Sequence, residues 1–145
     1  MEGQDIHSAK LLYDYALSFL GLPYRWGGDD PVNGVDCSGL CIELLQSVGV
    51  FPHGQDTTAA GLKSLFDSYK KSEGSFGALV FFGSSGVTHV GFCLNDKLMV
   101  EAGGGGSRTK TREDAAVQNA YVRIRPIRTR SDLVGFVMPP YPWRR

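Results

Sequence analysis

The spacing of hydrophobic positions divides the chain into a helical first half and a strand-rich second half. Apolar residues recur every three to four positions over residues 7–20, 37–48 and 56–66, which predicts three helices. Gly21 suits the position past the end of the first helix, and Asp36 can cap the free N–H groups at the start of the second. The residues expected to face the core are Leu12, Ala16, Phe19 and Leu20, then Leu40, Cys41, Leu44, Leu45 and Val48, and finally Leu62, Leu65, Phe66 and Tyr69.

After Gly77 the pattern changes to short apolar runs of the kind that form strands. We expect five strands, at residues 78–82, 89–94, 97–101, 121–126 and 133–138. The segment 102–119, AGGGGSRTKTREDAAVQN, is too rich in glycine and polar residues to belong to the core. Helices followed by antiparallel strands indicate an α+β fold, and the lack of repeats or of a linker predicts one domain over residues 1–145.

Two neighbouring strands place a histidine and a glutamate on one face of the expected sheet. The apolar positions that alternate along these strands are Val90, Phe92 and Leu94, then Leu98, Val100 and Ala102. For both sets to face one core, the turn between the strands must have an odd number of residues or a bulge. The same condition brings His89 and Glu101 together on the opposite face, where the carboxylate could accept a hydrogen bond from the imidazole.

Composition and charge exclude several classes of protein. Of the 145 residues, 42% are hydrophobic and 21% charged, which is ordinary for a soluble globular protein. The apolar runs are too short to span a bilayer, and the N-terminus has neither the basic start nor the cleavage site of a signal peptide. We therefore expect neither a membrane span nor an export signal.

Charge is balanced over the chain but unevenly placed along it. Residues 1–100 hold 6 basic and 11 acidic side chains, whereas residues 101–145 hold 9 basic and 4 acidic ones. The late basic residues include Arg123, Arg125, Arg128, Arg130, Arg144 and Arg145. They are either solvated side chains or a contact for an anionic polymer or a partner protein. Because aromatic residues are not regularly interleaved with them, we do not expect nucleic-acid binding.

The three cysteines differ in their expected surroundings. An odd number of cysteines without an export signal argues against a disulfide framework. The sequence contains neither a C-x-x-C nor an H-E-x-x-H pattern, so we expect no metal site. Cys41 lies on the buried stripe of its helix and Cys93 lies in a strand, so both are expected in the core. Cys37 alone begins a helix, where unpaired N–H groups and the helix dipole stabilise a thiolate. This makes it a candidate nucleophile, with His89 as its base and Glu101 as the group that orients the base.

Four motifs, GLPYRWGG, GVDCSGL, ALVFF and HVGFCLNDKLMVEA, agree in order and spacing with a known family. They resemble the NlpC-type cell-wall cysteine peptidases, which are compact relatives of papain. The resemblance covers residues 21–102 and implies a papain-like α+β domain whose N-terminal helices pack on an antiparallel sheet. It departs from the family at Ala78, where relatives have an acid before the middle strand, and we expect this to affect local structure only.

The resemblance also assigns roles to individual residues. Cys37 would be the nucleophile and His89 the general base, while Glu101 stands where most family members have a histidine. Tyr24 would help the backbone N–H of Cys37 bind the oxyanion. The residues that match positions lining the substrate pocket of relatives are Asp36 and Ser38.

The implied reaction is hydrolysis of a peptide or amide bond in bacterial peptidoglycan, typically between D-glutamate and a diamino acid of the stem peptide. It would proceed through a thioester on Cys37 and need no cofactor. Two alternatives are an acyltransferase that uses an acceptor other than water, and a non-catalytic wall-binding or assembly module. The lack of an export signal suits a phage tail or lysis component, or a toxin delivered by a secretion machine. Such a protein is made in the cytoplasm and acts on the wall after release or delivery.

Overall fold

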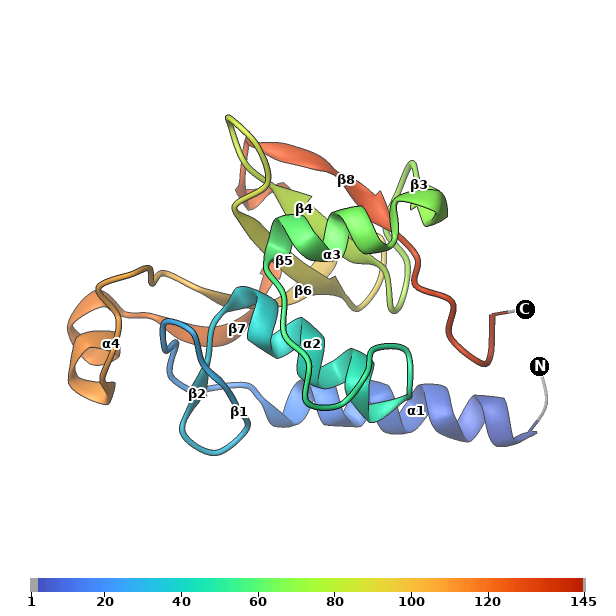
Figure 1. Ribbon diagram of the computed structural model, residues 1–145, viewed down its shortest axis with the longest axis horizontal. Helices are drawn as coiled ribbons and strands as arrows, with labels where there is room; N and C mark the ends of the chain where they lie inside the picture. Colours follow the sequence, from blue (N-terminus) through green and yellow to red (C-terminus); the bar gives the residue numbers. More distant parts are fainter. Residues whose placement is uncertain (1–2, 145) are drawn as a thin grey trace.

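A six-stranded antiparallel sheet carries the helices, as the computed structural model of residues 3–144 shows (Figure 1). Its strand order is β3-β8-β4-β5-β6-β7, and a separate two-stranded ribbon pairs β1 with β2. The helices are α1 (Gly3–Ser18), α2 (Cys37–Ser47), α3 (Ala59–Leu65) and α4 (Arg112–Gln118), with 3-10 turns η1 (Asp67–Tyr69) and η2 (Ile127–Thr129). The strands are β1 (Asp29–Asp30), β2 (Gly34–Val35), β3 (Lys70–Lys71), β4 (Leu79–Phe82), β5 (His89–Cys93), β6 (Leu98–Gly103), β7 (Tyr121–Pro126) and β8 (Leu133–Val137). The α+β prediction is confirmed.

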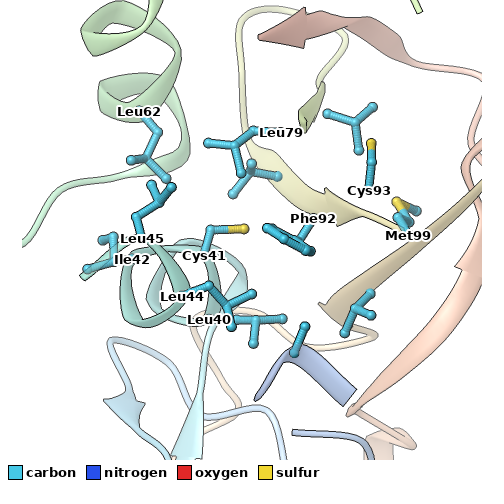
Figure 2. Close-up of a cluster of buried hydrophobic side chains, with 14 of the residues drawn as sticks. Leu40, Cys41, Ile42, Leu44, Leu45, Leu62, Leu79, Phe92, Cys93 and Met99 are labelled. Carbon is cyan, nitrogen blue, oxygen red and sulfur yellow. The ribbon is translucent and has the colours of Figure 1, made fainter. Parts of the chain in front are cut away.

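Helix α2 lies between α1 and the sheet, where it packs against β5 and β6 (Figure 1). Seven of its eleven residues are buried, since it has a neighbour on both sides. Figure 2 shows Cys41 and Phe92 facing each other across the contact between this helix and the sheet. The labelled residues of this cluster are Leu40, Cys41, Ile42, Leu44, Leu45, Leu62, Leu79, Phe92, Cys93 and Met99. Truncating one of these leucines to alanine would cost about 2–5 kcal/mol, so this packing holds α2 firmly against the sheet.

The predicted helix stripes are confirmed in the main but wrong at three positions. Leu20, Leu65 and Tyr69 are 41%, 52% and 42% exposed, although they had been placed facing the core. Helix α1 ends at Ser18, so Leu20 has left the helical spacing. Helix α3 ends at Leu65, and the following 3-10 turn η1 rotates Tyr69 away from the stripe.

The glycine-rich segment 102–119 contains structure that the sequence pattern did not predict. Helix α4 begins with a capping box, in which Thr111 and Asp114 bond each other's backbone N–H groups. Ala115 and the polar Thr109 are fully buried, so the expectation that this segment contributes nothing to the core is wrong. None of the helices in the described part of the chain is long and apolar enough to cross a membrane.

Candidate active site

The N-terminus of α2 is held by a single carboxylate. Asp36 caps the helix: its Oδ1 accepts the backbone N–H of Gly39 at 2.7 Å and the Ser38 hydroxyl at 3.2 Å. Its Oδ2 accepts the backbone N–H of Gly27 at 3.0 Å. Burial raises the pKa of Asp36, while these three hydrogen bonds act in the opposite direction. Asp36 therefore ties the loop before the helix to the turn on which Cys37 lies.

A second contact brings the same loop against the helix backbone. The N–H of Asp36 donates to the carbonyl oxygen of Gly28 at 3.0 Å. A Cβ atom on Gly39 would collide with that carbonyl, so only glycine lets the helix approach so closely. Within residues 3–144, the N–H groups of Cys37 and Ser38 donate to no acceptor. They are therefore free to bind an anion that forms next to the cysteine sulfur.

The strand register brings His89 and Glu101 together. Phe92 pairs with Val100 and Cys93 with Met99 across β5 and β6, so residues 95–97 form a three-residue turn. The odd turn length expected from the alternation is confirmed. In this register the side chains of His89 and Glu101 lie on the same face of the sheet, as diagonal neighbours on adjacent strands. His89 Nε2 lies 2.6 Å from Glu101 Oε1.

Glycines beside this pair leave room for it. Continuing the register places Gly91 opposite Glu101 and Gly103 opposite His89, so neither partner position has a side chain. A Cβ atom at Gly103 would lie 3.3 Å from Glu101 Oε2, a tight contact. The other oxygen contact of Glu101 is with Arg125, whose Nε lies 3.5 Å from Oε2. Glu101 is only 3% exposed, so its charge is compensated by these neighbours rather than by water.

The imidazole of His89 is in contact with both partners. Burial alone would lower its pKa, but hydrogen bonds with Cys37 and Glu101 outweigh burial and raise the pKa of His89 to about 9. The surroundings thus favour an imidazolium between a sulfur and a carboxylate. For the other two thiols, burial disfavours the charged form. It raises the pKa of Cys41 well above its ordinary value and that of Cys93 to about 12. Neither of these two forms a thiolate at neutral pH.

The two arms of a surface cleft meet at Cys37. The larger arm, of about 460 Å³, is lined by Asp36, Ser38 and the start of α3 with its preceding loop. The smaller arm, of about 250 Å³, is lined by His89, the glycine run 103–106 and Arg130. The residues that line both arms are Tyr24, Trp26, Cys37 and Thr88. Burial raises the pKa of Tyr24 above its ordinary value, so its hydroxyl stays protonated and can donate a hydrogen bond.

The structure therefore brings all six predicted site residues to one cleft. Cys37 and Glu101 both contact the His89 ring, and the other three, Tyr24, Asp36 and Ser38, line the larger arm. All three cysteines are unpaired. Among the described residues, no group of three or more histidine, cysteine, aspartate or glutamate side chains is arranged to hold a metal ion.

Comparison with known proteins assigns this arrangement to a family. The sequence pattern of the NlpC/P60 family matches residues 21–126. The chain belongs to the NlpC/P60 family. It is 38% identical over 95 residues to dipeptidyl-peptidase 6 of Lysinibacillus sphaericus, covering 63% of this chain and 31% of that protein. It is 32% identical over 96 residues to the bifunctional muramidase/DL-endopeptidase CwlT of Bacillus subtilis, covering 63% and 28%.

The solved structures agree with the family assignment. The peptidoglycan hydrolase RipB of Mycobacterium tuberculosis superposes with a TM-score of 0.67 over 97% of this chain and 68% of that one, at 24% identity. At this identity the likeness concerns the fold alone. The chain spans less than a third of the length of the two relatives named above. The resemblance inferred from the four motifs is confirmed.

Some cleft residues of this NlpC/P60 chain were missed by the sequence analysis. Trp26 is 54% exposed beside Cys37, although the motif YRWGG had drawn attention only to its tyrosine. Thr88 precedes the catalytic candidate His89, and its position before a strand start carried no signal of its own. Arg130 had been grouped with the other late arginines and not with the cleft. Only the tertiary fold brings these residues together.

Proposed function

We propose that this chain is a cysteine endopeptidase that cleaves stem peptides of bacterial peptidoglycan. The observation that carries the proposal is the buried His89 ring, which lies beside Cys37 in the cleft and bonds the Glu101 carboxylate through Nε2. A nucleophile, a base and a group that orients the base are the set that covalent acyl transfer requires. Membership in the NlpC/P60 family supports the substrate class, since CwlT is named a DL-endopeptidase and RipB a peptidoglycan hydrolase.

In the acylation step, the Cys37 thiolate attacks the carbonyl carbon and forms a C–S bond. The carbonyl oxygen becomes an oxyanion, for which the free N–H groups of Cys37 and Ser38 and the Tyr24 hydroxyl are the nearby donors. The His89 imidazolium gives its proton to the nitrogen, the C–N bond breaks and the amine leaves. Glu101 stabilises the imidazolium until that proton is transferred.

In the deacylation step, neutral His89 takes a proton from water while the water oxygen attacks the thioester carbon. The C–S bond breaks, the acid leaves, and the thiolate and imidazolium are restored. Because His89 delivers the proton to the leaving nitrogen, the amine side of the substrate occupies the arm that His89 lines, and the acyl side occupies the larger arm. We assign D-glutamate to the acyl side and the diamino acid to the amine side, following the family pattern.

Digestion of purified peptidoglycan, followed by mass spectrometry, tests this assignment. The wild-type protein should release fragments that end at D-glutamate, and Cys37→Ala should release none while keeping its fold. In water labelled with oxygen-18, hydrolysis introduces one heavy oxygen into each new carboxyl group. New amides without this label would instead support the acyltransferase. An undigested wall, or digestion by Cys37→Ala, would contradict the proposal. The route to the wall, as a phage or secretion-machine component, stays a prediction.

A further inference from the structure

We propose that Arg130 selects substrates whose amine side carries a carboxylate, such as a diamino acid with an acidic group at the end of its side chain. This inference rests on the proposed peptidase function and concerns which substrates are cleaved. Arg130 follows η2, in the connection between β7 and β8. Its side chain lines the smaller arm of the cleft together with Cys37 and His89, and it does not line the larger arm.

The guanidinium of Arg130 is held in one orientation by two neighbours. Its Nε donates to Asp132 Oδ1 at 3.0 Å and its Nη2 to Asp132 Oδ2 at 2.8 Å, which is a two-pronged ion pair. Its central carbon lies 5.0 Å from the centre of the Phe82 ring. Nη1 of Arg130 has no hydrogen-bond acceptor within the described residues. A side chain fixed in this way loses little conformational freedom when it binds a ligand.

One further two-donor edge of the guanidinium, formed by Nη1 and Nη2, remains for a ligand. A guanidinium has five N–H donors, and the Asp132 fork uses the edge formed by Nε and Nη2. The Arg130 side chain is 34% exposed, and it lines the smaller arm of the cleft. A carboxylate in the smaller arm would find a planar, oriented donor pair.

The two arms of the cleft differ in charge. The larger arm is lined by the carboxylates of Asp36 and Asp56 and has no basic side chain. In the smaller arm Arg130 is the one arginine or lysine, and no carboxylate lines that arm directly. Arg130 would therefore attract a substrate carboxylate on the amine side, whereas no basic side chain lines the acyl side to attract one there. The charge pattern thus favours an acidic group on the leaving amine.

Two matched peptides test the inference. Both are L-alanyl-γ-D-glutamyl-diaminopimelate with the main-chain carboxyl group of diaminopimelate blocked as a carboxamide, one with a free side-chain carboxylate and the other with that group also converted to a carboxamide. For the wild-type protein we expect kcat/KM to favour the carboxylate peptide by about 10- to 100-fold, the range of a hydrogen bond to a charged group. Arg130→Gln should bring this ratio close to one. Arg130→Lys, which keeps the charge without the planar fork, should give an intermediate ratio.

Arg128→Gln is the matched control, because Arg128 is exposed two residues away, outside the cleft, and the substitution removes the same charge. It should keep the wild-type ratio. A wild-type protein that cleaves both peptides equally well would overturn the inference and leave the peptidase function standing. So would an equal loss of kcat/KM for both peptides in the two Arg130 variants, since that result assigns Arg130 a positioning role. Cleavage of neither peptide would contradict the proposed function, and this inference with it.

Discussion

Substituting Glu101 by glutamine separates the charge of this residue from its shape. Glutamine keeps the length of the side chain and can still accept a hydrogen bond from His89 Nε2, which lies 2.6 Å from the carboxylate. It removes the negative charge that favours the imidazolium. If Glu101 stabilises the ion pair of Cys37 and His89, the variant should retain the fold and bind substrate, but should form the thioester more slowly.

The size of the effect follows from the electrostatics of the histidine. The surroundings raise the pKa of His89 to about 9 from an ordinary 6.5. At about 1.4 kcal/mol for each pKa unit, this favours the imidazolium by about 3.4 kcal/mol. Burial opposes this shift, while Cys37 and Glu101 both contribute to it, so the charge of Glu101 supplies on the order of 1–2 kcal/mol. Glu101→Gln should therefore lower the pKa of His89 and reduce kcat/KM on the order of 10-fold.

The sign of the pH dependence makes the test specific. His89 must be protonated to form the ion pair, so activity is lost as pH rises through its pKa, and the variant should lose activity at lower pH than the wild type. The value of kcat/KM for a stem peptide, measured from pH 5 to 10, reports this limb. Glu73→Gln, an exposed glutamate far from the cleft, is the control. A basic limb that does not move in Glu101→Gln would refute the reasoning.

Three further predictions concern the nucleophile and its surroundings. At neutral pH iodoacetamide should label Cys37 at least about 100-fold faster than the buried Cys41 and Cys93, as peptide mass spectrometry would measure; equal labelling would contradict the assignment of the nucleophile. Gly39→Ala should lower the free energy of unfolding by about 2 kcal/mol or more in urea titrations, since its Cβ meets a backbone carbonyl, and an unchanged midpoint would contradict that contact. Tyr24→Phe should reduce kcat by about 10- to 100-fold with little change in KM, and a change in KM alone would argue against an oxyanion role.

The elements that hold the catalytic candidates could be predicted from local pattern because their signals are local. Asp36 before an apolar stripe predicts a helix start, and the structure has the cap there. The alternation on β5 and β6 required an odd turn, and this fixed the shared face of His89 and Glu101. In both cases only one arrangement of the segment places all of its apolar residues on the side that faces the core.

The rest of the cleft could not be predicted, because its residues meet only through long-range packing. Arg130 lies 93 positions after Cys37, and nothing in its neighbourhood distinguishes it from the other late arginines. That cluster does not behave as one surface in the structure. Arg123 donates to the carbonyl oxygen of Asn119 at 2.6 Å, whereas Arg130 pairs with Asp132. Arg125 lies beside Glu101, and Arg144 donates to the carbonyl oxygen of Phe76. Four of these arginines thus have specific acceptors in the chain, which composition alone does not reveal.

The proposed active site divides into a buried part that holds the catalytic candidates and a looped part that lines the cleft. Cys37, His89 and Glu101 lie on α2, β5 and β6, whose mutual contacts are among the most deeply buried in the described chain. Both arms of the cleft are lined largely by loops, at residues 56–58, 87–88 and 104–106. Because loops accept substitutions that buried strands do not, changes there should alter KM and the choice of substrate. Changes on the three buried elements should alter kcat, since they move the reacting groups relative to each other.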